Sequence, residues 1–115
     1  MKTHIVMYVG AGFDKDGESI SHEKEETATR IVEAAICKVA GGFTRTEAIG
    51  GWVDADGKII REPTIKFDII YDNFNSDAAK VAFRLARLAK KEFNQNEVLI
   101  ELIPDVVTLT SSKAY

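Results

Sequence analysis

The sequence has few of the residues on which metal-based or covalent chemistry depends. Its 115 residues include one cysteine and two histidines, so no internal disulfide can form and no Cys/His cluster predicts a metal site. The cysteine, Cys37, stands in an apolar helical segment, where we expect a small buried side chain rather than a nucleophile. No Ser-His-Asp pattern can be argued either. We therefore expect no metal, no cofactor and a reducing, cytosolic compartment.

Long apolar runs and charge tracts are also missing. The segment 1–9 is too short for the apolar part of a signal peptide, and no run approaches the ~20 apolar residues that a membrane span needs. The formal net charge is −3, and no lysine- or arginine-rich tract stands out, which disfavours a nucleic-acid partner. We expect a cytoplasmic protein that binds neither membrane nor nucleic acid. Its mild acidity suits a cationic small molecule better than an anionic one.

The composition that is present is that of an ordinary globular protein, with 45% apolar and 29% charged residues. It predicts a single domain over 1–115. Alternating apolar residues and turn signals predict strands over 1–9, 43–53, the stretch after a turn at 54–57, and 98–103, with Pro104 ending the last.

Two helices are expected between these strands. Ser21 caps the first helix and Gly41-Gly42 ends it, with Ile31 and Val39 among the residues of its apolar face. Ser76 caps the second helix, which carries its own apolar face.

The resulting order, β-α-β-β-α-β, is the split pattern of ferredoxin-like α+β domains, in which two helices cover one face of an antiparallel sheet. The strands are apolar on more than one face, notably at Ile70, Leu99 and Ile103. The second face should therefore be covered by another chain, most simply a copy of this one. The tail, 105–115, is expected either to add a short strand or to cross to a neighbouring subunit.

A β-hairpin with its turn at 54–57 is the most informative local prediction. Just after the turn, Glu62 stands directly before Pro63, which restricts the glutamate to an extended backbone. A proline inside a strand indicates an edge or a bulge. A carboxylate held in this way is a candidate for chemistry. The simpler alternative is an exposed strand carboxylate paired with Arg61 or Lys66.

Glycines mark two further places of interest. Gly50-Gly51 indicates a bulge or a close backbone approach in the strand before the turn. The loop 10–17 lacks the Gly-Lys-Ser/Thr ending of a phosphate loop. We interpret it either as a flexible cover over a pocket or as a simple connector.

Four side chains are further candidates for ligand binding. Trp52 is a candidate for stacking on a base, although a lone tryptophan near a turn is more often part of a core or an interface. Glu97 lies at the entrance to the last strand, where sites often form. Gln95 and Asn96 are amides at the same entrance, and their simpler role is to cap the preceding helix.

The motifs around these residues resemble those of phage-encoded S-adenosylmethionine lyases, also known as S-adenosylmethionine hydrolases. The resemblance rests on Gly-Gly-Trp and Arg-Glu-Pro-Thr-Ile-Lys-Phe within 50–67, and on Ala-Phe-Arg-Leu-Ala-Arg-Leu-Ala-Lys-Lys-Glu-Phe-Asn-Gln-Asn-Glu-Val-Leu-Ile within 82–100. It covers about residues 43–103. It implies a ferredoxin-like subunit of a homotrimer with sites between subunits, in the cytoplasm of an infected bacterial host. The same patterns also resemble an uncharacterised family of small bacterial domains.

The resemblance further implies an activity and its residues. These lyases cleave S-adenosylmethionine to 5′-methylthioadenosine and L-homoserine lactone, and so deplete the host methyl donor as an anti-restriction device. The essential glutamate of the family falls on Glu62, and its aromatic residue, a tyrosine elsewhere, falls on Trp52. A second acid maps to either Asn96 or Glu97. The carboxylate of the substrate would displace the sulfonium itself, with Glu62 holding the substrate ammonium.

Three alternatives stay open at this point. The first is hydrolysis, which would give homoserine as the primary product. The second is a non-enzymatic domain that binds a nucleoside or methionine-like ligand. The third is an oligomerisation domain whose apolar sheet face serves only as an interface.

Overall fold

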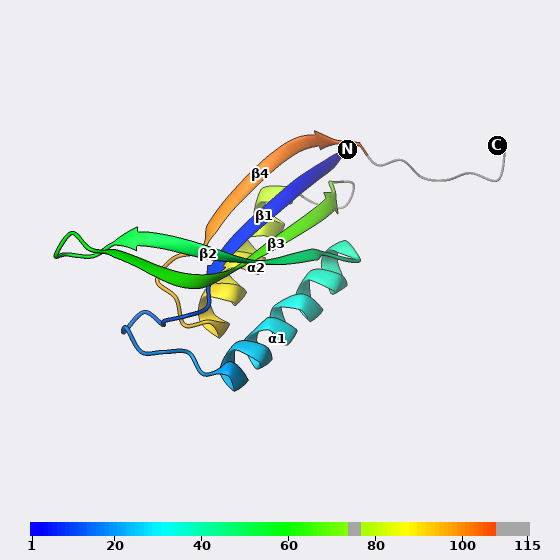
Figure 1. The fold of residues 1–115 in the computed structure, drawn as a ribbon. Helices are drawn as coiled ribbons and strands as arrows, with labels where there is room; N and C mark the ends of the chain where they lie inside the picture. Colours follow the sequence, from blue (N-terminus) through cyan, green and yellow to red (C-terminus); the bar gives the residue numbers. More distant parts are fainter. Residues whose placement is uncertain (74–76, 108–115) are drawn as a thin grey trace.

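The structure, a computed structural model, describes residues 1–73 and 77–107. Its elements are β1 (Lys2–Gly10), α1 (His22–Ala40), β2 (Thr44–Val53), β3 (Ile59–Asp72), α2 (Ala78–Glu92) and β4 (Leu99–Val106). The four strands form one antiparallel sheet in the order β2-β3-β1-β4. Both helices cover the same face of this sheet (Figure 1). The predicted ferredoxin-like α+β fold is confirmed, while the prediction for the tail falls mostly on 108–115, outside the described residues.

Local capping explains where the helices begin and end. The Ser21 side chain accepts a hydrogen bond from the backbone N–H of Lys24 at 3.2 Å, and Gly41 ends α1 with φ of 85°, as the sequence predicts. The cap of α2 is Asp77, whose side chain accepts from the N–H of Ala79. The predicted cap, Ser76, lies outside the described residues.

The helix α1 buries a narrower stripe than the sequence predicts. Ala28, Thr29, Val32 and Ile36 are buried, whereas Ile31 and Val39 are 40% and 47% exposed. The predicted burial of Cys37 is also wrong, because this side chain is exposed. One residue further along a helix is a turn of about 100°, so Cys37 points away from the sheet that Ile36 contacts.

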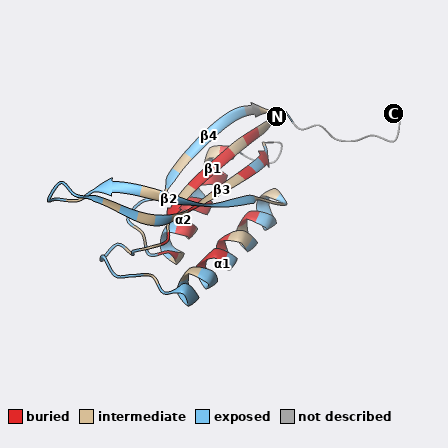
Figure 2. Ribbon diagram, in the orientation of Figure 1, coloured by how far each residue is buried: buried red, intermediate tan, exposed pale blue. Residues whose placement is uncertain are grey.

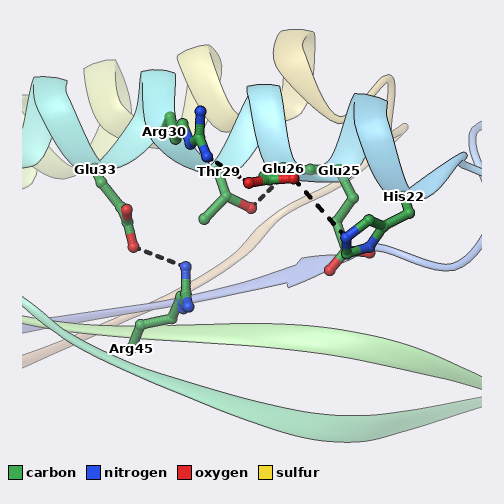
Figure 3. A network of polar contacts seen from close by, with 7 residues as sticks. All are labelled: His22, Glu25, Glu26, Thr29, Arg30, Glu33 and Arg45. Atoms are coloured by element: carbon green, nitrogen blue, oxygen red, sulfur yellow. Dashed lines mark hydrogen bonds and ion pairs between the residues drawn. The ribbon is translucent and has the colours of Figure 1, made fainter.

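Polar contacts follow α1, and one of them joins the helix to β2. Figure 3 shows Arg45 of β2 beside Glu33 of α1, and their nitrogen and oxygen atoms lie 2.9 Å apart. Nearer the start of the helix, Arg30 pairs with Glu26, and the hydroxyl of Thr29 donates to the carbonyl of Glu25. Exposed pairs of this kind contribute little stability individually, so the packing of the apolar stripe holds α1 in place.

The core lies between the helices and the centre of the sheet. Alternate residues of β1 and β3 point into it, among them Ile5, Met7, Phe67 and Ile69, all 0% exposed. Phe43 packs its ring edge-on against Phe67, with centroids 6.2 Å apart. The predicted alternation along β3 is thus confirmed.

The structure excludes one of two alternatives predicted at Gly50-Gly51 and corrects the prediction made at Pro104. Gly50 and Gly51 pair with β3 in regular register, so there is no bulge at these residues. Pro104 does not end the last strand, because β4 continues to Val106. It is tolerated because β4 is an edge strand and its register against β1 shifts between Lys2 and His4. Within the described part of the chain, no helix is both long and apolar enough to cross a membrane.

Candidate functional site

An open cavity of about 1170 Å³ lies where the β2–β3 hairpin, the loop after β1 and the start of β4 meet. All five predicted site residues line this cavity: Glu62, Trp52, Gln95, Asn96 and Glu97. They come from the hairpin and from the segment between α2 and β4, which are far apart along the chain, so the fold itself brings them together.

Strand pairing places Glu62 and Trp52 on the sheet face that the helices leave open. Gly50 lies opposite Glu62, and Trp52 lies opposite Ile60, so these four residues share one face. A β-carbon on Gly50 would lie 2.5 Å from the Thr64 hydroxyl oxygen. The close approach predicted at this glycine is therefore confirmed.

Pro63 lies within β3 at a position where its missing N–H leaves no hydrogen bond of the β1–β3 ladder unmade. The β1–β3 ladder ends at the pair Gly10–Thr64, and the N–H of Ala11 donates to the Pro63 carbonyl over 2.9 Å. A residue in an antiparallel ladder turns its N–H and C=O toward the same neighbour, so the missing donor of Pro63 faces the end of β1. Beyond this point β3 pairs only with β2, which confirms the predicted edge.

The loop between β1 and α1 packs directly on Glu62. The backbone N–H of Phe13 donates to Oε2 of Glu62 at 3.1 Å. A β-carbon on Gly12 would lie 2.8 Å from Cδ of Pro63, so this approach requires glycine. Asp14, Lys15 and Gly17 of the loop also line the cavity. The loop is therefore more than a simple connector, because it forms a wall of the pocket.

Gln95 joins the same loop to the end of α2. Asn94 has a φ of 50° and the N–H of Gln95 donates to the Lys90 carbonyl, the hydrogen bond that typically closes a helix. The side-chain Nε2 of Gln95 donates to the carbonyl of Phe93 at 3.0 Å and to that of Phe13 at 2.7 Å. Gln95 therefore caps the helix and holds the loop at once.

Carboxylates predominate among the charged residues of the cavity. Within the described part of the chain, its lining contains Asp14, Asp54, Glu62 and Glu97 but only one cation, Lys15. The predicted alternative, in which Arg61 or Lys66 pairs with Glu62, is not found within the described residues. A cavity of this charge attracts a cationic ligand.

Asp14 shapes the loop through its ionised carboxylate. Its Oδ1 accepts from the N–H groups of Asp16 and Glu18 at 2.9 and 3.0 Å. Partial burial raises the pKa of Asp14, but the two backbone hydrogen bonds, a side-chain hydrogen bond with Asn94 and the charge of Lys24 outweigh it, so the pKa is lowered overall. The loop is thus stabilised by a carboxylate that is charged at neutral pH.

Tyr8 of β1 carries a second polar cluster along the open face. A hydrogen bond with Glu101, then burial and the Glu101 charge, raise the pKa of Tyr8. The ammonium of Lys66 lies 5.8 Å from the centre of the Tyr8 ring and 3.7 Å from a carboxylate oxygen of Asp68. Tyr8 also lines the cavity, at the side of the site away from the hairpin turn.

Sequence reasoning missed Tyr8 and Phe13 as site residues. Both faces of β1 are apolar in sequence, so alternation could not show which way Tyr8 points. Phe13 contributes its backbone to Glu62, and a backbone contact leaves no residue signature. Its position between two glycines, Gly12 and the turn glycine Gly17, is the only available signal.

Metal-ligating side chains are not clustered in the part of the chain that the structure describes. Among those residues, no group of three or more histidine, cysteine, aspartate or glutamate side chains is placed to hold a metal ion. Glu62, the amides of Gln95 and Asn96 and the aromatic residues are groups that the cavity offers to a ligand.

The element order, the single antiparallel sheet and the acidic cavity define a ferredoxin-like α+β protein with an open cavity beside its sheet. No protein-family model matches the sequence, and no curated protein matches it. The fold is similar to that of a phage SAM lyase in complex with S-methyl-5′-thioadenosine, with a TM-score of 0.66 and 17% identity over 96% of this chain and 90% of that one. A phage SAM lyase in its apo state gives a TM-score of 0.63 and 18% identity, covering 95% and 89%.

The same fold also occurs in a protein described differently. The periplasmic divalent cation tolerance protein CutA from Archaeoglobus fulgidus is similar with a TM-score of 0.58 and 13% identity, covering 95% of this chain and 88% of that one. At such identities the similarity is one of fold. The resemblance to S-adenosylmethionine lyases that the motifs predict is confirmed at that level.

Proposed function

We propose that this protein is a lyase that cleaves S-adenosylmethionine to 5′-methylthioadenosine and L-homoserine lactone. The observation that carries the proposal is the placement of Glu62, a carboxylate fixed by the Phe13 N–H in an acidic cavity. The fold around it is shared with phage SAM lyase structures. In this proposal Trp52 stacks on the adenine, and Glu62 balances the positive charge of the substrate.

The reaction needs little from the protein beyond positioning. One oxygen of the substrate carboxylate forms a bond to Cγ, and the Cγ–S bond breaks with its electron pair going to sulfur. The sulfonium becomes a neutral thioether, and neither a proton nor a water molecule is consumed. Holding the methionine arm in the attack geometry supplies much of the rate acceleration. A site of amides, aromatics and one fixed acid is suited to that task.

We further propose that the working unit is a homotrimer with cavities between subunits. The cavity of about 1170 Å³ exceeds the roughly 300–1,000 Å³ of typical ligand pockets, and it is open to one side. Exposed apolar side chains flank it, with Leu99 60% and Phe83 63% exposed. A neighbouring copy would narrow the cavity and cover these residues. Light scattering should give about 38 kDa, three times the 12.7 kDa of one chain.

The reaction is tested by incubating the purified protein with S-adenosylmethionine in ¹⁸O-labelled water and recording mass spectra over time. Lyase chemistry predicts methylthioadenosine and unlabelled homoserine lactone as first products, with label entering only the carboxyl group when the lactone opens later. Hydrolysis would instead give homoserine labelled at its hydroxyl from the start.

The remaining alternatives are separated by the same incubation and a titration. Saturable binding of S-adenosylmethionine without product would favour a binding domain. Neither binding nor product would favour an oligomerisation domain. Turnover would fit the depletion of a methyl donor in the cytoplasm of an infected host, which we propose as the biological role.

A further inference from the structure

The backbone N–H and C=O of one residue, Phe13, fix two polar side chains that line the cavity, those of Glu62 and Gln95. Its N–H donates to Oε2 of Glu62 at 3.1 Å, and its carbonyl accepts from Nε2 of Gln95 at 2.7 Å. The orientation of one side chain is thereby tied to that of the other through the two successive peptide groups that flank Cα of Phe13.

These contacts determine which atoms stay available to a ligand. Nε2 of Gln95 donates to two carbonyls, those of Phe13 and Phe93, which occupies both of its hydrogens. Exchanging the amide oxygen and nitrogen would put an acceptor against two acceptors, so the hydrogen-bond partners assign the amide orientation. Oε1 of Gln95 and Oε1 of Glu62 are then the oxygens left for a ligand.

Both of these oxygens lie over Gly10. A β-carbon on Gly10 would be 3.0 Å from Oε1 of Glu62 and 3.0 Å from Oε1 of Gln95. The two oxygens are therefore at most 6.0 Å apart, twice 3.0 Å. One nitrogen bridges two oxygens that lie within about 5.6 Å of each other, with two charge-assisted hydrogen bonds of about 2.8 Å each.

We propose that Glu62 and Gln95 together form an acceptor-only subsite for a primary ammonium group, and that Gln95 determines specificity for it. The subsite presents two oxygens and one negative charge, so it accepts a group with several N–H donors and rejects an uncharged chain without donors. Resting on the proposed function, this assigns the subsite to the α-ammonium of the methionine arm. The backbone of Phe13 is then the element that positions both side chains.

The test compares S-adenosylmethionine with its analogue in which hydrogen replaces the α-ammonium. Calorimetric dissociation constants of both are measured for the wild type, Gln95→Met and Gly10→Ala, with Gly42→Ala as the matched glycine control because nothing lies within 4 Å of a β-carbon there. We expect the wild type to prefer the ammonium-bearing ligand by about 100-fold. Gln95→Met should reduce this preference to about 10-fold, because losing one hydrogen bond to a charged group weakens binding by a factor of roughly ten.

The ratio of the two dissociation constants distinguishes a role of Gln95 in recognising the ammonium from a role in supporting the loop. If Gln95 only supports the loop, both ligands weaken equally and the ratio of the two constants stays at the wild-type value, which overturns the proposal. Gly10→Ala should lower the ratio, and Gly42→Ala should leave it unchanged; the reverse result also overturns it.

Failure of the proposed function is distinguishable from failure of this inference. An ammonium preference without any methylthioadenosine release sustains the subsite and removes the lyase activity. Turnover with equal affinity for both ligands sustains the activity and removes the subsite. Absence of binding for both ligands removes the subsite as well.

Discussion

The two ends of the strand β3 are built from similar residues but have opposite surroundings. At one end, Phe67 and Ile69 are fully buried beneath the helices, and at the other end Ile59 is 60% exposed. Figure 2 shows the same contrast, with buried residues in the centre of the sheet and exposed ones along the projecting hairpin. Apolar side chains that the chain does not cover itself favour contact with another partner. The buried end therefore stabilises the fold, whereas the exposed end lines the cavity and leaves apolar side chains available to another chain.

The largest effect should come from the buried end. Phe67→Ala removes a fully buried ring that packs against Phe43, and truncations of this kind cost about 3–5 kcal/mol. We expect urea denaturation followed by circular dichroism to show a midpoint lowered accordingly. A change below about 1 kcal/mol would show that this end of the sheet is not the folding core.

At the exposed end, substitution should affect assembly rather than folding. Val53 and Ile59 face each other across the hairpin and are 65% and 60% exposed. Since burying each would contribute about 1.5–3 kcal/mol, the double change to serine should lower the mass from light scattering toward that of one chain. The circular dichroism of the subunit should stay that of the wild type. An unchanged mass would show that Val53 and Ile59 lie outside any interface between subunits.

A smaller effect is expected in the loop wall. The pKa of Asp14 is lowered in the folded protein from its ordinary 3.8, so its contribution to stability is complete above pH ~4 and is lost as the pH falls through the folded pKa. The hydrogen-exchange protection of the backbone amides of 11–20, corrected for intrinsic exchange rates, should decrease as the pH falls through this range. Asp14→Asn should show reduced protection already at neutral pH, and an unchanged pH profile in this variant would assign the effect to another group.

The smallest effect concerns Tyr8, at the centre of the open face. Its pKa is raised from 10.0 by Glu101, so the neutral phenol stabilises the fold below pH 10, and this contribution is lost as the pH rises through the folded pKa. Ultraviolet difference titration of wild type against Tyr8→Phe isolates this tyrosine. Glu101→Gln should move its titration to lower pH, whereas an unmoved titration would contradict the hydrogen bond.

The fold could be predicted from the sequence because its signals are local. The alternation of Ile65, Phe67 and Ile69, the Ser21 cap and the Gly41 stop each depend on neighbouring residues. The predictions are wrong where the outcome depends on how the elements pack in the folded protein. The exposure of Cys37 depends on how α1 sits on the sheet, and the tolerance of Pro104 depends on β4 being an edge.

The site could be predicted only in part for the same reason. Glu62 stood out because a proline follows it, and Gln95 because a strand follows its helix. The contact that joins them is a backbone group of Phe13, eighty-two positions from Gln95. Main-chain hydrogen bonds across such separations depend on the folded topology, and no sequence motif indicates them.

The most direct test of the central claim compares product release by the wild type, Glu62→Gln and Glu47→Gln, the last being a matched control at an exposed glutamate of the same hairpin outside the cavity lining. Mass spectra should show methylthioadenosine from the wild type and from Glu47→Gln. Release by Glu62→Gln should fall at least about 100-fold, with its assembly and thermal unfolding unchanged. Equal release from all three proteins would contradict a role for Glu62 in the reaction.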